Sequence, residues 1–404
     1  MSNSNRDTNG GPLLSRRTAL SHTLTGLGAL GLVGLGSGHA SESADERRVR
    51  EFLKPLLLTR ADVDDWLAGK EFPFCKYDPE LGYLHIDRDF KEGVGGAICQ
   101  YRYDRLDARR MKAHADKPCR INTYGNSFTS CEQVSDGETW QEVLAAHLCE
   151  PVRNYGIGGY SVYQAYLRMR REEQRAPARY IVLNIFDDDH YRNLHGWQRF
   201  KFGVNRKSPN PTVPHVRVNP DKKEFREVAN PCPTRESIYE LCDLDAVCRK
   251  FKDDVYLQNR LARAAGQQGR KRAPASDFDD RELTRHALFA SMEIVKKVRE
   301  FAAGQQRTVL YVLSYNPQTV RRFLKDGERF DREFVDFIQR ERLPYVDLLQ
   351  AHAADYAKFR GSIDEYVARY FIGHYNPLGN FFCAFAMKDK LVSMLNPKPP
   401  AYAK

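Results

Sequence analysis

Residues 120–129, RINTYGNSFT, combine a short strand-like run with a glycine turn and a serine. The run ends where Gly125 permits a sharp turn, and Ser127 follows two positions later. A serine at the end of a strand can expose its hydroxyl to a nearby base, and the backbone N–H groups of the turn can hold an oxyanion. A glycine turn with a helix-capping serine would explain the same pattern. The stretch therefore predicts either a nucleophile at Ser127 or an ordinary start of a helix.

The rest of the chain repeats this strand pattern between amphipathic stretches. Five short apolar runs have the character of buried strands: Arg120–Ser127, Val152–Ile157, Arg179–Phe186, Thr308–Ser314 and Pro344–Leu349. Helical periodicity lies between and after them, near residues 140–148, 162–171, 280–303, 318–340 and 377–395. Alternating strands and helices predict an α/β fold in which helices cover a parallel sheet.

Two regions interrupt that alternation. Residues 41–118 precede the first strand and form a predicted N-terminal extension packed on the core, with β-like pieces near Tyr83–Ile86 and Ile98–Tyr103. Residues 194–283 separate the third and fourth strands, and their alternating runs at 213–218 and 224–228 predict a hairpin. Because ligands bind at the carboxyl ends of parallel strands, this insertion is a candidate lid or substrate-recognition element. A structural embellishment is the alternative.

The insertion contains aromatic and basic residues that could recognise a substrate. Aromatic faces stack on sugar rings, and basic groups pair with acidic substituents. We expect them to be exposed over the Ser127 pocket, although a patch packed on the core is the alternative. The residues are Trp197, Arg199, Phe200, Lys201, Phe202, Arg206 and Lys207.

The N-terminus resembles a bacterial export signal. Residues 15–20, SRRTAL, resemble a twin-arginine motif, and a weakly apolar run follows at 24–36. Gly38 and Ala40 then offer small residues at the −3 and −1 positions of a cleavage site. The run is too short and glycine-rich for a membrane span, which needs about 20 apolar residues. A twin-arginine-type signal peptide over residues 1–40 thus predicts an exported, periplasmic or extracytoplasmic protein with no stable membrane insertion. A disordered tail is the alternative.

Composition sets wide limits on function. Of 404 residues, 42% are hydrophobic and 29% charged, as in ordinary globular proteins. The net charge of +10 is spread among many acids, so it indicates solubility with only a weak preference for polyanionic partners. We predict no nucleic-acid partner, and the sequence gives no oligomeric state.

Three further blocks stand at predicted strand ends or before a helix. Residues 154–161, NYGIGGYS, end the second strand; residues 187–193, DDDHYRN, follow the third; residues 373–380, GHYNPLGN, precede the last helix. Together with residues 124–129, these blocks resemble the motifs of the SGNH (GDSL-type) hydrolase superfamily in order and spacing. The resemblance runs from about residue 120 to 395, with the insertion between.

That resemblance implies a fold and a chemistry. The fold would be a flavodoxin-like, three-layer α/β/α arrangement with a five-stranded parallel sheet, covering residues 119–404 apart from the insertion. The chemistry would be ester hydrolysis through an acyl-enzyme, without a cofactor. Ser127 would be the nucleophile and His374 its base, and the N–H groups of Ser127 and Gly159 would form the oxyanion hole.

The sequence departs from the family pattern at two functional positions. Asp188 stands where the family has an asparagine that donates to the oxyanion, and only its protonated form could donate. Burial beside Asp187 and Asp189 would favour that form. The aspartate usual just before the histidine is also missing, and Asp364, Glu365 or a backbone carbonyl could orient the ring instead.

These observations favour an exported serine esterase or deacylase acting on a small-molecule or carbohydrate ester, such as an acetyl ester. An O-acyltransferase acting on a polysaccharide and a catalytically weak binding protein derived from the fold are the alternatives. A metal site is disfavoured, because adjacent residues of a strand point to opposite faces. Its ligands would have been Asp187, Asp188, Asp189, His190 and His195.

Overall fold

The computed structural model describes residues 44–70, 74–204, 211–266, 277 and 280–403. The predicted signal peptide at 1–40 lies outside the described residues, and so do Arg206 and Lys207 of the insertion. Within the described part of the chain, no helix is long and apolar enough to span a membrane.

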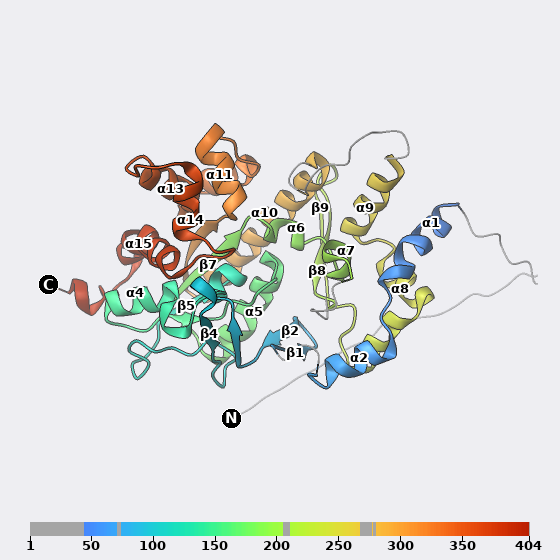
Figure 1. The fold of residues 1–404 in the computed structure, drawn as a ribbon, viewed down its shortest axis with the longest axis horizontal. Coiled ribbons are helices and arrows are strands. Elements are labelled where there is room, and N and C mark those ends of the chain that lie inside the picture. Colours follow the sequence, from blue (N-terminus) through green and yellow to red (C-terminus); the bar gives the residue numbers. More distant parts are fainter. Residues whose placement is uncertain (1–43, 71–73, 205–210, 267–276, 278–279, 404) are drawn as a thin grey trace, which may run out of the picture. The chain divides into compact units, whose positions relative to one another are not determined.

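A five-stranded parallel sheet forms the centre of the described unit (Figure 1). Its strands lie in the order β11-β10-β7-β5-β6. Every residue of β7 is buried, as expected for a central parallel strand covered on both faces. The predicted five-stranded sheet is confirmed. The strands are β5 (Ile121–Tyr124), β6 (Arg153–Asn154), β7 (Tyr180–Phe186), β10 (Thr308–Ser314) and β11 (Tyr345–Asp347).

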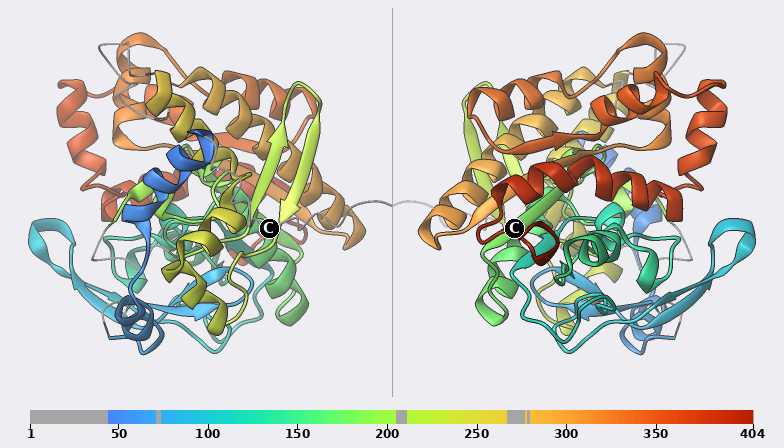
Figure 2. Two further views of the ribbon diagram at one scale, coloured as in Figure 1. Left: turned by 90° about the vertical axis from the view of Figure 1, so that its right-hand side faces the viewer. Right: turned by 90° about the vertical axis from the view of Figure 1, so that its left-hand side faces the viewer.

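Helices cover the sheet in two groups (Figure 2). One group comprises α5 (Val162–Arg175), α10 (Arg281–Gly304) and α12 (Arg332–Arg340), which contact one another through α10. The other group comprises α4 (Trp140–Leu148), α13 (Leu348–Tyr356) and α15 (Pro377–Met394), and α15 contacts each of the other two. The three-layer α/β/α architecture is therefore confirmed.

The strands expected at Arg120–Ser127 and Val152–Ile157 are shorter, as β5 and β6 show, and two further predicted boundaries are wrong for local reasons. The single helix expected at 318–340 is two helices, α11 (Pro317–Asp326) and α12, because Gly327 ends the first in a left-handed conformation with φ +68°. The strand expected over Pro344–Leu349 stops at Asp347, whose side chain accepts from the N–H of Leu349 and starts α13.

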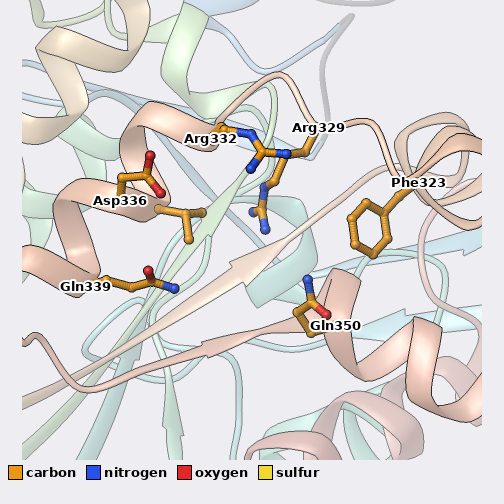
Figure 3. Close-up of a pocket in the computed structure, with 8 residues that line it drawn as sticks. Phe323, Arg329, Arg332, Asp336, Gln339 and Gln350 are labelled. Atoms are coloured by element: carbon orange, nitrogen blue, oxygen red, sulfur yellow. The ribbon is translucent and has the colours of Figure 1, made fainter.

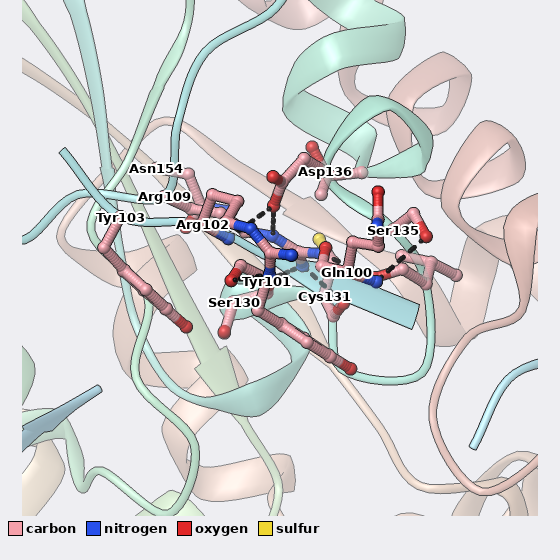
Figure 4. A network of polar contacts seen from close by, with 12 residues as sticks. Gln100, Tyr101, Arg102, Tyr103, Arg109, Ser130, Cys131, Ser135, Asp136 and Asn154 are labelled. Carbon is pink, nitrogen blue, oxygen red and sulfur yellow. Dashed lines mark hydrogen bonds and ion pairs between the residues drawn. The ribbon is translucent and has the colours of Figure 1, made fainter. Parts of the chain in front are cut away.

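The N-terminal extension consists of two helices and two hairpins. They are α1 (Ala44–Leu53), α2 (Arg60–Leu67), the antiparallel pair β1 (Cys75–Asp78) with β2 (Gly82–His85), and the pair β3 (Arg88–Lys91) with β4 (Ile98–Tyr101). Just after β4, the buried Arg109 joins the extension to the segment that follows Ser127 (Figure 4). Its guanidinium donates to the Asp136 carboxylate at 2.9 Å and to the carbonyls of Ser130, Cys131 and Val134.

The insertion forms a small unit with its own aromatic cluster. Trp197 and Phe200 are buried against Phe251, with the Trp197 and Phe251 rings 5.7 Å apart. The expectation that these aromatic residues are exposed is wrong, except for Phe202, which is 44% exposed. A short helix, α6 (Asp189–Arg192), lies between β7 and the insertion. The α-helices and strands of the insertion are α7 (Arg199–Phe202), β8 (His215–Asn219), β9 (Glu224–Val228), α8 (Leu244–Phe251) and α9 (Val255–Gly266).

The basic residues of α7 are not exposed either, because Arg199 is buried and the Lys201 side chain is only 9% exposed. Arg199 donates to the backbone carbonyls of Leu56 and Leu57 in the extension. Lys201 forms ion pairs with Asp188 and Asp277. Both side chains join the insertion to other parts of the chain, which leaves neither free for a substrate.

Candidate active site

Ser127 stands where β5 gives way to the short helix α3 (Ser127–Ser130). The turn before it requires glycine, because Gly125 has φ +150° and a Cβ there would lie 2.2 Å from Thr129 Oγ1. Asn126 then caps the helix: its Oδ1 accepts from the Phe128 N–H at 2.8 Å, and its Nδ2 donates to Asp189 at 2.7 Å. Ser127 is therefore held at the carboxyl edge of the sheet by a rigid turn.

His374 contacts the segment that begins at Ser127. Its ring centroid lies 5.0 Å from that of Phe128, the residue after the serine. Its backbone N–H donates to Gln133 Oε1 at 2.7 Å, and its Nδ1 lies 3.3 Å from the same oxygen. Among the described residues no hydrogen bond joins Ser127 to His374. The two blocks nevertheless meet at one edge of the sheet.

The side chain that contacts the Nδ1 side of His374 is that of Gln133, which the sequence analysis did not identify. The two candidate acids, Asp364 and Glu365, lie on α14 (Ile363–Tyr370), and each has another partner. Asp364 pairs with Arg321 at 2.7 Å and its side chain is 83% exposed, while Glu365 caps the helix by accepting from Ser362. Neither carboxylate orients His374 in this structure.

The loop that carries Gly159 is covered from both sides. Gly159 has φ +79°, and a Cβ there would lie 2.7 Å from the Tyr83 hydroxyl. That hydroxyl donates to the carbonyl of Gly158 at 2.6 Å and accepts from Gln198 Nε2 at 3.2 Å. Tyr83 belongs to the extension and Gln198 to the insertion, so both additions reach the predicted oxyanion loop.

Comparisons with known proteins give structural likenesses only. No family model and no curated protein sequence matches the chain. Three solved structures align with 67–68% of it. An acetyl xylan esterase is 13% identical over 99% of its own chain, with a TM-score of 0.35. An α/β hydrolase from the metagenome of Lake Arreo, Spain, is 11% identical over 93%, with a TM-score of 0.36. A GDSL-like lipase from Bacteroides thetaiotaomicron is 11% identical over 86%, with a TM-score of 0.30.

The sheet order, the two helical layers and the positions of the motif blocks agree with the resemblance found in the sequence. The fold is a three-layer α/β/α arrangement around a five-stranded parallel sheet, as that resemblance implies. Within this fold, the blocks containing Ser127, Gly159, Asp188 and His374 all follow strand ends or precede a helix, as the motifs predict.

Asp188, which stands where the resemblance implies an asparagine, forms ion pairs with two basic side chains. Its carboxylate lies 2.9 Å from Arg192 and 2.9 Å from Lys201 of the insertion. Burial raises the pKa of Asp188, but Lys201 and Arg192 outweigh it and hold the pKa well below its ordinary value. The expectation of a protonated Asp188 is therefore wrong, and an ionised carboxylate cannot donate to an oxyanion.

The two neighbouring aspartates behave in the opposite way. Burial raises the pKa of Asp187 to about 8 and that of Asp189 to about 7. Asp189 accepts from Asn126 and from the Phe186 N–H, so it supports the serine turn. Within the described residues, no group of three or more His, Cys, Asp or Glu side chains is arranged to hold a metal.

The histidines beside this acidic cluster are structural. His190 Nδ1 lies 2.7 Å from the Ser291 hydroxyl, and burial lowers its pKa to about 4. His195 packs edge-on against Tyr256, and its pKa is lowered mainly by burial. Both rings are neutral core residues near neutral pH.

A separate cavity of about 430 Å³ lies among α11, α12 and α13 (Figure 3). It contains none of the predicted site residues, so it is distinct from the Ser127 region. Its lining includes Phe323, Arg329, Arg332, Asp336, Gln339 and Gln350.

Proposed function

We propose that the chain is an exported serine esterase or deacylase that hydrolyses an ester of a small molecule or carbohydrate, for example an acetyl ester. The observation that best supports this is the contact of His374 with Gln133, on the segment that begins at Ser127. A histidine whose Nδ1 proton is bound in this way presents its unprotonated Nε2 as a base.

The proposed reaction uses side chains of this chain alone. Ser127 Oγ attacks the acyl carbon while its proton passes to His374 Nε2, and that proton then moves to the departing alcohol. The N–H groups of Ser127 and Gly159 would hold the oxyanion. Water then attacks the acyl-enzyme, with His374 as base again. Because Asp188 is ionised, the oxyanion hole lacks the side-chain donor that the family resemblance implies.

Labelling with a fluorophosphonate tests the nucleophile directly. The Ser127 hydroxyl should displace fluoride and form a single covalent adduct that peptide mass spectrometry places on Ser127. Ser127→Ala should abolish labelling and lower ester hydrolysis by about 10⁴-fold or more. Ser130→Ala, which alters another buried serine of α3, is the matched control and should label normally. An adduct on another residue, or unchanged turnover in Ser127→Ala, would place the chemistry elsewhere.

Acyl transfer to a polysaccharide hydroxyl is the second candidate, favoured by the cover over Gly159. Tyr83 and Gln198 approach that loop from the extension and the insertion, and such cover can exclude water from an acyl-enzyme. Product analysis with an acyl donor and an added oligosaccharide distinguishes the two reactions, since transfer yields an acylated sugar and hydrolysis yields free acid.

A further inference from the structure

His374 has a neutral partner where the SGNH resemblance implies a carboxylate. Gln133 Oε1 is 2.7 Å from the backbone nitrogen of His374 and 3.3 Å from Nδ1. An amide oxygen can fix the orientation of the ring and keep a proton on Nδ1. It carries no negative charge, however, and so cannot stabilise the imidazolium that forms when Nε2 accepts a proton.

A carboxylate is present on the other side of the ring. Glu132 Oε2 lies 3.7 Å from His374 Nε2, and its Oε1 lies 3.4 Å from the buried Arg88. The Glu132 side chain is only 22% exposed, so its charge acts on the imidazole with little screening by water. The negative charge absent at Nδ1 is therefore supplied beside Nε2.

The backbone turn that carries Glu132 and Gln133 is strained, and it sets the positions of both side chains. Cys131 and Gln133 are both left-handed, with φ of +58° and +70°, on either side of Glu132. Residues other than glycine adopt this conformation only rarely, because the Cβ atom crowds the backbone. The strained turn is held by the Glu132 N–H, which donates to Ser127 O at 3.0 Å, and by the Gln133 N–H, which donates to the Tyr101 hydroxyl at 2.7 Å. Strain maintained at such a position indicates function.

Two glycines leave space for these side chains. A Cβ on Gly373 would lie 2.8 Å from Gln133 Oε1, and a Cβ on Gly158 would lie 2.0 Å from Glu132 Oε1. The histidine loop and the oxyanion loop are thus each shaped around one of the two residues.

Four charged groups face His374 from the surrounding elements. Glu132 follows α3, Arg88 and Glu92 belong to or follow β3, and Arg192 belongs to α6. Burial, Arg192 and Arg88 lower the pKa of His374, whereas Glu132 and Glu92 raise it. Glu132 is the acid whose contact with the ring is direct.

We infer that the two tasks usually performed by one acid are divided here, with Gln133 orienting His374 and Glu132 stabilising its imidazolium form. This rests on the proposed role of His374 as base. When the Ser127 O–H bond breaks and the Oγ–acyl bond forms, the proton on Nε2 lies next to the Glu132 carboxylate. When the acyl–alcohol bond breaks, that proton passes to the departing oxygen. Both Gln133 and Glu132 are positioning residues that act through His374.

The test compares Glu132→Gln, Gln133→Glu and the double variant. Glu132→Gln should lower the pKa of His374, move the acidic limb of kcat/KM to lower pH and reduce the plateau by about tenfold. Gln133→Glu should move the limb to higher pH, and the double variant should return it toward the wild-type position. Asp364→Asn removes an exposed carboxylate near the histidine block and is the matched control, which should leave the limb unchanged.

Titration of His374 by NMR, on protein labelled with ¹⁵N-histidine, separates this inference from the proposed function. The esterase proposal fails if neither the wild type nor any variant hydrolyses an ester. The division of charge and orientation still stands in that case if the pKa of His374 falls in Glu132→Gln and rises in Gln133→Glu. An unchanged titration in Glu132→Gln, or a double variant no closer to wild type than Glu132→Gln, would overturn the inference. If Glu132→Gln does not fold, Gln133→Glu alone decides, because it must raise the pKa.

Discussion

Asp187, at the carboxyl end of β7, is a buried acid with half of its hydrogen-bonding capacity unused. Its Oδ2 accepts from the N–H and the side-chain amide of Asn316 and from the Thr319 hydroxyl. Its buried Oδ1 has no partner among the described residues. Burial raises the pKa of Asp187 to about 8, so the folded chain keeps this group protonated at a pH where the unfolded chain ionises it.

This residue should make stability fall as the pH rises. Because the pKa is about 8 in the folded state and about 4 in the unfolded state, the native state binds more protons across that window, and stability decreases from about pH 4 to pH 8. Asp187→Asn should flatten the decline and gain about 2 kcal/mol or more relative to wild type between pH 5 and pH 8. Urea unfolding at pH 5 and at pH 8 measures this difference in unfolding free energy, and Asp364→Asn, which changes an exposed carboxylate, is the control. Parallel curves for wild type and Asp187→Asn would show that Asp187 is ionised in the fold.

At the residue scale, short sequence blocks predict Ser127 and His374 but not the residues around them. A motif reports positions close together in the chain, whereas Gln133 reaches His374 across 241 positions. The charge of Asp188 likewise depends on Lys201, which a separate helix of the insertion supplies. Neighbouring acids in the sequence suggested mutual repulsion, but cations brought close by folding decide the outcome.

At the scale of elements, the Asp188 ion pairs join two short helices, α6 and α7. Asp188→Asn should destabilise the protein by about 3 kcal/mol at pH 7, because a buried charge pair loses one partner. The folded pKa of Asp188 is depressed, so its contribution is fully present above the unfolded pKa near 4 and is lost as the pH falls toward the folded value. The difference between variant and wild type should therefore shrink below about pH 4. Urea unfolding at pH 7 and at acidic pH measures it, and an unchanged difference would contradict an ionic role.

The strands β7 and β10 were predictable because each is a nearly continuous, buried apolar run of a length typical of strands. The short helices α6 and α7 were not, since four residues are too few to show a helical period. The end of α11 depends on Gly327, which lies inside the stretch that the sequence pattern predicted to be one helix.

At the scale of the whole described unit, the extension and the insertion meet beside the candidate site. Tyr83 of the extension accepts from Gln198 of the insertion above the Gly158–Gly159 loop, and Arg199 donates to the carbonyl of Leu56. The pattern of apolar runs could place both regions outside the α/β alternation, but it could not show that they converge. Contacts between segments this distant in the chain are encoded in no local pattern.

Arg109 tests whether the extension shapes the site or merely packs on it. Its guanidinium binds the Asp136 carboxylate and the carbonyls of Ser130, Cys131 and Val134, on either side of Glu132 and Gln133. Arg109→Met should cost about 3–5 kcal/mol of unfolding free energy, because it leaves the buried Asp136 charge without its partner. It should also lower kcat/KM at temperatures where the variant remains folded, because the turn that orients His374 loses its support.

The neighbouring Arg110 provides the matched control for this prediction. Its side chain is exposed, so Arg110→Met should change stability by no more than about 0.5 kcal/mol and leave ester hydrolysis unchanged. Urea unfolding and steady-state kinetics on the three proteins separate the two effects. Equal kcat/KM for folded Arg109→Met and wild type would show that the extension stabilises the fold without shaping the site. A loss confined to Arg109→Met, at a temperature where all three proteins are folded, is the result expected if catalysis depends on the extension, which lies outside the α/β core.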